Sequence, residues 1–239
     1  MILKLHDLTA LKLRSHSAIT HEDAAALRDL PSQTEYKRAG EDIVRQGDRP
    51  NVAVVVISGW VARYHSLVNG RRQFLSFHCA GDMPDAQSLF LDRMDHSVCA
   101  IDDAVIATIP HRRILEMFTQ RPSLGIAIWR ETLVDAAIFR QTITSLGSRD
   151  PRERLAHFFA EHFERASNVK LTSNGVCPFP LTQQQIGDAL GMAPVTMSRA
   201  LRTLRETGAV DLRDQQLIVN NWEMLAEIGQ FDDAYLHLR

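Results

Sequence analysis

Arginine side chains recur at helical spacing in the C-terminal part of the chain, where Arg199, Arg202 and Arg205 lie three residues apart. A guanidinium group presents a planar fork of donors that matches the O6 and N7 atoms of guanine and also pairs with phosphate oxygens. Ser198 adds a hydroxyl beside the first arginine. These residue types along one side of a helix are suited to recognition of double-stranded DNA in the major groove.

The arginines belong to the second of two short predicted helices. Thr182 and Gln185 have the spacing of a capping box at the start of the first helix. Gly191 can end that helix in the left-handed conformation, and Pro194 suits the first turn of the next. The apolar residues of the second helix are spaced to face a core: Met197, Leu201 and Leu204. The pattern predicts a helix, a glycine turn and a second helix.

A hairpin is predicted directly after this helix pair. Gly208 ends the second helix, and residues 209–212 and 216–219 have the composition of strands around a polar turn. A helix-turn-helix followed by such a wing is typical of DNA-binding domains. Glycine-linked helix pairs also occur in proteins that do not bind DNA, so the interpretation depends on the arginines and the hairpin.

The charge balance excludes a general attraction to nucleic acid. The 239 residues include 27 Lys and Arg and 29 Asp and Glu, for a formal net charge of −2. Binding to DNA therefore needs a local basic patch, and the arginine-bearing helix face is the candidate. Cys79, Cys99 and Cys177 are too few and too scattered for a disulfide framework or a four-cysteine iron–sulfur cluster. No segment has the pattern of a signal peptide or a membrane span, so we expect a cytoplasmic protein without a membrane partner.

The first half of the chain has the pattern of a β-domain. After helical apolar spacing up to Leu27, short β-type runs separated by Gly, Asp and Asn follow from Pro31 to Pro110. The clearest runs are residues 51–57, 59–65, 73–78, 97–101 and 104–109. Many short strands at this spacing predict a sandwich or jelly roll.

A long helix is predicted after the β-domain. Residues 123–147 repeat apolar side chains at helical spacing on more than one face. Such a helix can cover one domain and offer a seam to another subunit, and a helix buried within one domain is the alternative. Residues 147–149 have the composition of a hinge, and Asp150 restarts a helix as its N-cap. A last helix, without an assigned role, is predicted after Val219.

Four motifs occur in this order: Gly40–Asp48, Val56–Trp60, Ala80–Asp82 and Leu181–Leu204, the last being the most specific. With the order of the parts, they resemble the Crp/Fnr family of bacterial transcription regulators over nearly the whole chain. The resemblance implies an α+β fold with an N-terminal, jelly-roll-like β-roll that senses an effector (residues 1–122), a long dimerisation helix (123–147) and a C-terminal winged helix-turn-helix with an extension (148–239). It further implies a homodimer on a two-fold symmetric operator, controlled by a signal sensed in the β-roll, with RNA polymerase as a partner if the protein is an activator.

The resemblance places six DNA contacts on this sequence. They are Thr182, Val195, Thr196, Ser198, Arg199 and Arg202. The Ser198–Arg199 pair matches residues that read base edges, whereas Arg202 and the two threonines match contacts to the phosphate backbone. Val195 stands where the family commonly places a glutamate that accepts from cytosine. Valine cannot accept a hydrogen bond and would pack on a thymine methyl group instead, so a different operator is expected.

The signal-sensing region departs from the cyclic-nucleotide-binding members of the family. Asp85-Ala86-Gln87 stands where those members have Gly-Glu-Leu, and His96 stands where an arginine neutralises the cyclic phosphate. Asp82 and Asp85 would add negative charge beside a phosphate, so cyclic AMP is not the expected effector, and the sequence identifies no cofactor. The candidates for binding a small-molecule effector are Asp85, Gln87, Ser88, Arg93 and His96. For the polar cluster from Asp92 to His96, a solvated loop is the alternative.

Two other functions are compatible with parts of the pattern. The β-domain could be a regulatory ligand module whose helical C-terminal domain docks on a protein partner. A jelly-roll metalloenzyme is the other alternative, but the His-x-His spacing it needs is missing. The nucleophile-elbow, P-loop and dinucleotide motifs are missing too, so no enzymatic activity is expected. The histidines of the β-domain, among them His78, His96 and His111, are interpreted as structural.

Overall fold

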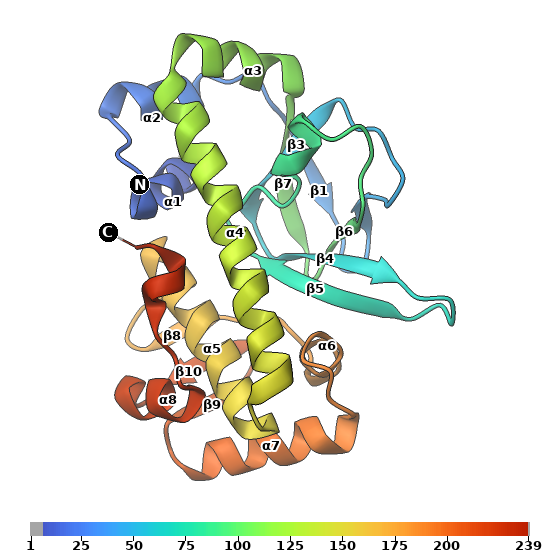
Figure 1. Cartoon of the computed structure of the whole chain (residues 1–239), viewed down its shortest axis with the longest axis vertical. Helices are drawn as coiled ribbons and strands as arrows, with labels where there is room; N and C mark the ends of the chain where they lie inside the picture. Colours follow the sequence, from blue (N-terminus) through green and yellow to red (C-terminus); the bar gives the residue numbers. More distant parts are fainter. Residues whose placement is uncertain (1–6, 239) are drawn as a thin grey trace. The chain divides into compact units, whose positions relative to one another are not determined.

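The computed structural model describes residues 7–238, which divide into two compact units with the boundary along the chain between Leu133 and Val134 (Figure 1). This point lies inside the long helix α4 (Pro122–Ser148). The observed helix extends the expected 123–147 by one residue at each end. The division of the chain into three functional parts, with boundaries at 122 and 147, stays a prediction.

The first unit contains two antiparallel sheets. One has the order β1 (Gln33–Lys37), β7 (Ala104–Pro110), β3 (Val52–Ser58). The other has the order β2 (Asp42–Val44), β6 (Ser97–Ala100), β4 (Val61–Ser66), β5 (Arg72–His78). All five expected β-runs are strands, within two residues at each end, and the fold is the expected β-roll with a long helix and a winged helix-turn-helix.

Strand β3 is apolar on both of its faces. Ala53 and Val55 belong to a core cluster that includes residues of the surrounding helices, whereas Val56 belongs to a second cluster with residues of β4 and β6. Alternate side chains of a strand point to opposite faces, so β3 lies between a helical layer and the second sheet. Its run of consecutive valines is therefore buried on both sides.

Helices cover the β1-β7-β3 sheet. They are α1 (Asp7–His16), α2 (His21–Arg28), the short 3-10 helix η1 (Ala86–Leu89), α3 (His111–Gln120) and the start of α4. The spacing did not predict α3. Its N-cap position is Pro110, which forms no side-chain cap, and only Ile114 and Met117 are buried in it. Neither the start signal nor a long apolar stripe marks this helix in the sequence.

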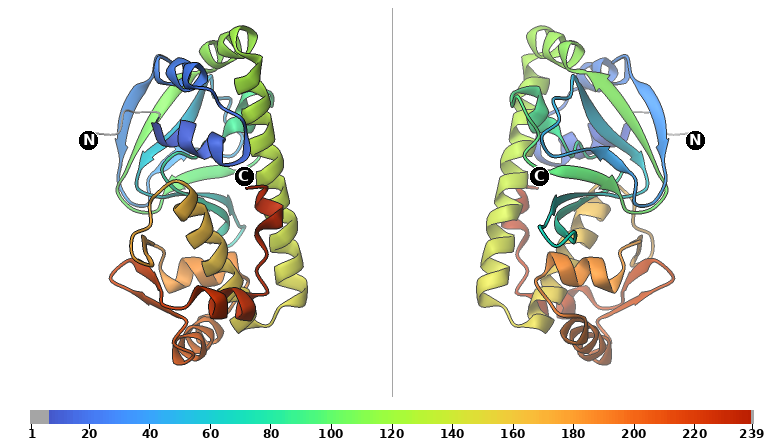
Figure 2. Two further views of the ribbon diagram at one scale, coloured as in Figure 1. Left: turned by 90° about the vertical axis from the view of Figure 1, so that its left-hand side faces the viewer. Right: turned by 90° about the vertical axis from the view of Figure 1, so that its right-hand side faces the viewer.

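The second unit consists of helices and a small sheet. Its elements after α4 are α5 (Pro151–Asn168), β8 (Val176–Pro178), α6 (Gln183–Ala189), α7 (Pro194–Glu206), β9 (Val210–Arg213), β10 (Gln216–Val219), α8 (Trp222–Gly229) and the 3-10 helix η2 (Asp233–Leu236). Asp150 caps α5 in a capping box with Glu153, as predicted. Figure 2 shows the β9–β10 hairpin projecting from the helices of this unit, which confirms the wing.

Over residues 7–238, no helix is long and apolar enough to cross a membrane.

Candidate nucleic-acid interface and signal-sensing region

The turn between α6 and α7 has the geometry that the sequence predicted. Thr182 accepts a hydrogen bond from the Gln185 backbone N–H, and the Gln185 side chain accepts from the Thr182 N–H. Gly191 has φ +63°, a conformation that a side chain at this position would disfavour. A Cβ added at Gly187 would be 3.1 Å from the carbonyl oxygen of Met192 in the turn and 3.6 Å from the Met197 Cβ of α7. The two helices therefore cross in close contact, held by local signals.

The outer face of α7 is polar and exposed, while its inner face is core. Met197, Leu201 and Leu204 are at most 2% exposed, as expected. Val195 is 71% exposed and stands on the opposite side. A shallow concavity on this outer face is lined by Pro194, Val195, Ser198, Arg199 and Arg202. The structure thus brings four of the six predicted DNA-contacting residues onto one surface.

The two threonines are arranged differently from those four. Thr182 is exposed at the start of α6, and its hydroxyl already donates to the Gln185 side chain at 3.0 Å. Thr196 is half-buried in the first turn of α7. Their contacts with phosphate stay predictions.

Arg205 was grouped with the DNA-facing arginines, and the structure gives it another role. Its Nε lies 2.7 Å from Asp211 Oδ1, and its guanidinium also donates to the Leu212 carbonyl oxygen. Arg205 therefore ties the end of α7 to strand β9 of the wing. By contrast, Arg199 has no ion-pair partner among the described residues, and Arg202 reaches Glu206 only at 3.8 Å. The spacing of arginines along a helix cannot reveal a partner on the following strand.

Helix α4 carries an exposed apolar stripe. The stripe consists of Ile126, Trp129, Leu133 and Ile143, which are 68%, 61%, 49% and 70% exposed. With Ala136 and Arg140 between them, these positions follow one another at alternating spacings of three and four. That spacing is the a/d pattern of a coiled-coil seam. We call these six positions the α4 seam. The opposite side of the helix is buried, which leaves the seam without a partner within the described chain.

Asp85 is fully buried rather than solvated in a loop. Its Oδ1 accepts from the Val54 backbone N–H at 2.8 Å, while Oδ2 is a buried atom without a hydrogen-bond partner. Burial raises the pKa of the Asp85 carboxyl to about 7, although the charge of the buried Arg63 opposes the shift. Arg63 donates from Nε to the Pro84 carbonyl oxygen at 2.6 Å. Local sequence patterns do not reveal these contacts, because each joins a strand to a distant turn.

The other effector candidates lie in separate environments. Gln87 is 3.2 Å from His96 Nε2, so these two residues come together as expected of a shared site. Ser88 instead pairs with His111 at 3.0 Å, and Arg93 is exposed. Binding of an effector by these residues stays a prediction. The contact between Gln87 and His96 is the one observation that supports it.

The region does not fit a cyclic phosphate. Such a phosphate needs a fixed cation whose charge is free for it. The Arg63 guanidinium already donates to the Pro84 carbonyl and its charge also acts on the buried Asp85 carboxyl, while burial lowers the pKa of His96 from its usual value.

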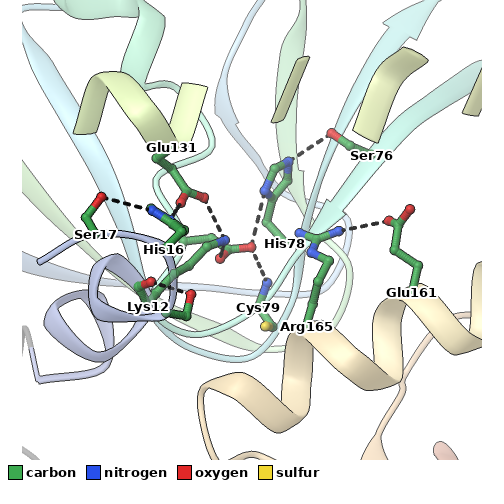
Figure 3. A network of polar contacts seen from close by, with 11 residues as sticks. Lys12, His16, Ser17, Ser76, His78, Cys79, Glu131, Glu161 and Arg165 are labelled. Atoms are coloured by element: carbon green, nitrogen blue, oxygen red, sulfur yellow. Dashed lines mark hydrogen bonds and ion pairs between the residues drawn. The ribbon is translucent and has the colours of Figure 1, made fainter. Parts of the chain in front are cut away.

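A buried polar network connects α1, α4 and the end of β5 in the first unit (Figure 3). Lys12 pairs with Asp82 and, at 2.9 Å, with Glu131, which also contacts His16. The His78 Nδ1 lies 3.3 Å from Asp82. These neighbours hold the pKa of the Glu131 carboxyl at about 2, because the charge of Lys12 and the His16 contact outweigh its desolvation. Asp82 therefore has Lys12 and His78 as partners within the fold.

Several histidines and all three cysteines of the described chain lie in packed surroundings. His78, His96 and His111 each have a hydrogen-bond partner, and their interpretation as structural residues stays a prediction. All three cysteines are buried, and burial raises the pKa of Cys99 to about 11 and of Cys177 to about 12. Among residues 7–238, no group of three or more His, Cys, Asp or Glu is placed to hold a metal ion.

Comparison with known proteins matches both units. A family model described as a cyclic nucleotide-binding domain matches residues 34–121, and one described as a Crp-like helix-turn-helix domain matches residues 153–228. The nitrogen fixation regulation protein FixK of Rhizobium meliloti is 30% identical over 183 residues, which span 76% of this chain and 79% of FixK. The transcriptional activator protein FnrL of Cereibacter sphaeroides is 27% identical over 223 residues, or 90% of this chain and 88% of FnrL. The solved structure of FixK2 from Bradyrhizobium japonicum shares the fold, with a TM-score of 0.73 at 24% identity over 83% of this chain and 98% of that one.

A β-roll, a long helix with a free apolar seam and a winged helix-turn-helix with an exposed basic face define a DNA-binding transcription regulator. The chain belongs to the Crp/Fnr family.

Proposed function

We propose that the protein acts as a homodimer on a two-fold symmetric operator, with one α7 helix in the major groove of each half-site. The observation that favours this most is the exposed outer face of α7, on which Ser198, Arg199 and Arg202 line one concavity. Arg199 is unpaired among the described residues, so its fork is free to donate to guanine O6 and N7. Ser198 would contact a neighbouring base edge.

The remaining contacts follow from the same face. Val195 projects from the first turn of α7 and would pack against a thymine methyl group. Arg202, one turn beyond Arg199, together with Thr182 and Thr196, would hold phosphates and fix the register of the helix. With these roles the protein would bind DNA and would not act as an enzyme. We also propose that it acts in the cytoplasm.

Dimerisation would proceed through the α4 seam. Three large apolar side chains of the seam, Ile126, Trp129 and Ile143, are more than 60% exposed. Pairing two copies of the helix would remove this surface from water, which stabilises association by roughly 25 cal/mol for each Å² of apolar area buried. A two-fold dimer then presents two α7 helices to two half-sites.

The signal sensed by the β-roll is proposed to be neither cyclic AMP nor an iron–sulfur cluster. The buried Asp85 carboxyl, on which the charge of Arg63 acts, lies where a cyclic phosphate would add a second acid, and the chain has three cysteines, all buried, where an iron–sulfur cluster needs four ligands. A small-molecule effector would contact the Gln87–His96 pair. Because relatives such as FnrL are named transcriptional activators, we propose RNA polymerase as a partner of the DNA-bound dimer.

Selection of bound duplexes from a random DNA pool at physiological salt tests the proposal, with Arg199→Ala selected in parallel. We expect a two-fold symmetric motif for the natural chain and loss of one specified base position per half-site for the variant. Recovery of no motif, with or without small molecules from a cell extract, would contradict DNA readout and favour a protein partner for this face.

A further inference from the structure

The segment after the wing lies against the corner between α4 and α5. We call residues 222–238, which include α8 and η2, the C-terminal segment. Arg149 occupies the corner and is 8% exposed. Its guanidinium donates from Nε to the Gly229 carbonyl at 3.1 Å and from Nη2 to the Gln230 carbonyl at 3.2 Å. Carbonyls at the end of a helix have no partner within it, so the arginine fork satisfies two acceptors at the end of α8.

A second set of contacts fixes the C-terminal segment on α5. His157 Nδ1 is 3.0 Å from the same Gly229 carbonyl. The Tyr235 hydroxyl donates to Glu161 Oε2 at 2.8 Å and lies 3.2 Å from His157 Nε2. The Phe231 ring packs edge-on against His157, with 5.4 Å between the ring centroids. The segment therefore contacts both α5 and Arg149.

The corner is also connected to the helix-turn-helix. The Arg154 guanidinium donates to the carbonyl of Leu146 in the last turn of α4 and to that of Arg149 at the corner, at 3.1 and 3.0 Å. It donates as well to the carbonyl of Leu190, the C-cap of α6, at 2.8 Å. The corner and the turn that precedes α7 are thus joined through one side chain, Arg154.

We propose that Arg149, held by the C-terminal segment, is a positioning residue that sets the direction of α7 relative to the last turns of α4. The inference rests on the proposed dimer, because two α7 helices can meet two half-sites of fixed spacing only if each leaves the α4 seam in one direction. Arg149 touches no base in this scheme. Its loss affects how strictly the dimer measures spacing and leaves the reading of each half-site intact.

The test compares Arg149→Lys with the matched Arg152→Lys in the full chain. Both substitutions keep the positive charge, but a lysine cannot reproduce the planar fork that donates to two carbonyls. Arg152 is exposed in the first turn of α5, where only its backbone takes part in the cap. Affinity is measured for the selected operator and for versions with one central base pair added or removed, which turns one half-site by about 35° relative to the other.

We expect the natural chain and Arg152→Lys to prefer the selected spacing by about tenfold or more, and Arg149→Lys by about threefold or less at a similar affinity for an isolated half-site. Tyr235→Phe, which removes the bond to Glu161 and leaves Arg149 in place, should relax the preference in the same direction. Unchanged spacing preference in both variants would overturn the inference while leaving the proposed function standing. Equal loss of affinity on every spacing, together with a lower unfolding temperature, would show that Arg149 serves the stability of the fold alone. Absence of a symmetric operator for the natural chain would overturn the proposed function and this inference with it.

Discussion

Arg205 and Asp211 form an ion pair, with 2.7 Å between Nε and Oδ1, that joins the last turn of α7 to the wing. The two side chains are 40% and 32% exposed, so the pair contributes at most about 1 kcal/mol to folding. Its effect should fall on the hairpin. We expect Arg205→Ala to weaken DNA binding by loosening the wing while leaving the base preference of each half-site unchanged. Selection from a random pool followed by affinity titration checks this, and a changed motif would contradict it.

Arg199→Ala should remove one specific base interaction in each half-site. The expected cost is about 1–3 kcal/mol per interaction, with relaxed preference at that position only. The measurement is affinity for the selected operator and for each of its single-base variants. An equal loss on operator and random DNA would refute base reading by Arg199.

Arg202→Ala should behave differently, because its partner is proposed to be a phosphate. Affinity for all sequences should fall together, and the slope of log affinity against log salt should decrease by about one unit for each phosphate that the arginine no longer neutralises. Titrations at several salt concentrations separate this result from that of Arg199→Ala. A salt slope equal to that of the natural chain would place Arg202 away from the backbone.

Ile143→Glu should dissociate the dimer. The side chain is 70% exposed in the isolated chain and lies on the α4 seam. Losing two buried isoleucines, at about 1.5–3 kcal/mol each, weakens association by about 100-fold or more, before charge repulsion is counted. Sedimentation equilibrium measures this, with Thr119→Glu, at an exposed position of α3, as the control. A dimer of unchanged affinity would exclude this face.

Asp85 should make stability fall as the pH rises. Burial raises the pKa of its carboxyl to about 7 in the folded chain, against 3.8 for the free group. Between these values the folded state holds a proton that the unfolded state has released, so the contribution is fully present below pH 3.8 and is lost as the pH passes 7. The effect is on the order of 4 kcal/mol. Asp85→Asn should remove it, and denaturant unfolding of both proteins from pH 4 to 8 measures the difference. Parallel stability curves would contradict an ionisable Asp85 in this window.

Glu131 should have the opposite sign. Its neighbours lower the pKa of the carboxyl to about 2, so its contribution is present above the usual value of 4.5 and is lost as the pH falls toward 2. Glu131→Gln should therefore cost on the order of 3 kcal/mol at pH 7 and progressively less below pH 4.5. Glu116→Gln, an exposed residue of α3, is the control and should change stability by less than about 1 kcal/mol. A pH-independent cost for Glu131→Gln would show that shape rather than charge matters there.

The sequence predicts those parts of the structure that are determined by interactions between residues close together in the chain. Thr182 and Gln185 form a capping box three residues apart, and Gly191 forms the turn by its own backbone conformation. The helix-turn-helix could therefore be predicted from residues of that segment alone. Helix α3 has no such cap and was missed.

Partners distant in sequence account for the remaining differences. The buried Asp85 carboxyl accepts from Val54, 31 residues away, and the Arg149 side chain donates to carbonyls 80 and 81 residues further along the chain. Single polar residues give no indication of such partners, because a solvated aspartate and a buried one have the same local pattern.

Because all three cysteines are buried, an added surface cysteine can be labelled selectively. Thiol reagents attack the thiolate, and the raised pKa values of Cys99 and Cys177 leave almost none of it at neutral pH in the folded state. A single cysteine placed on the exposed wing turn, for instance at Asp214, would then react selectively without removal of the natural ones. Pairs of such labels in a dimer would report the separation of the two wings as a spectroscopic distance, with and without DNA.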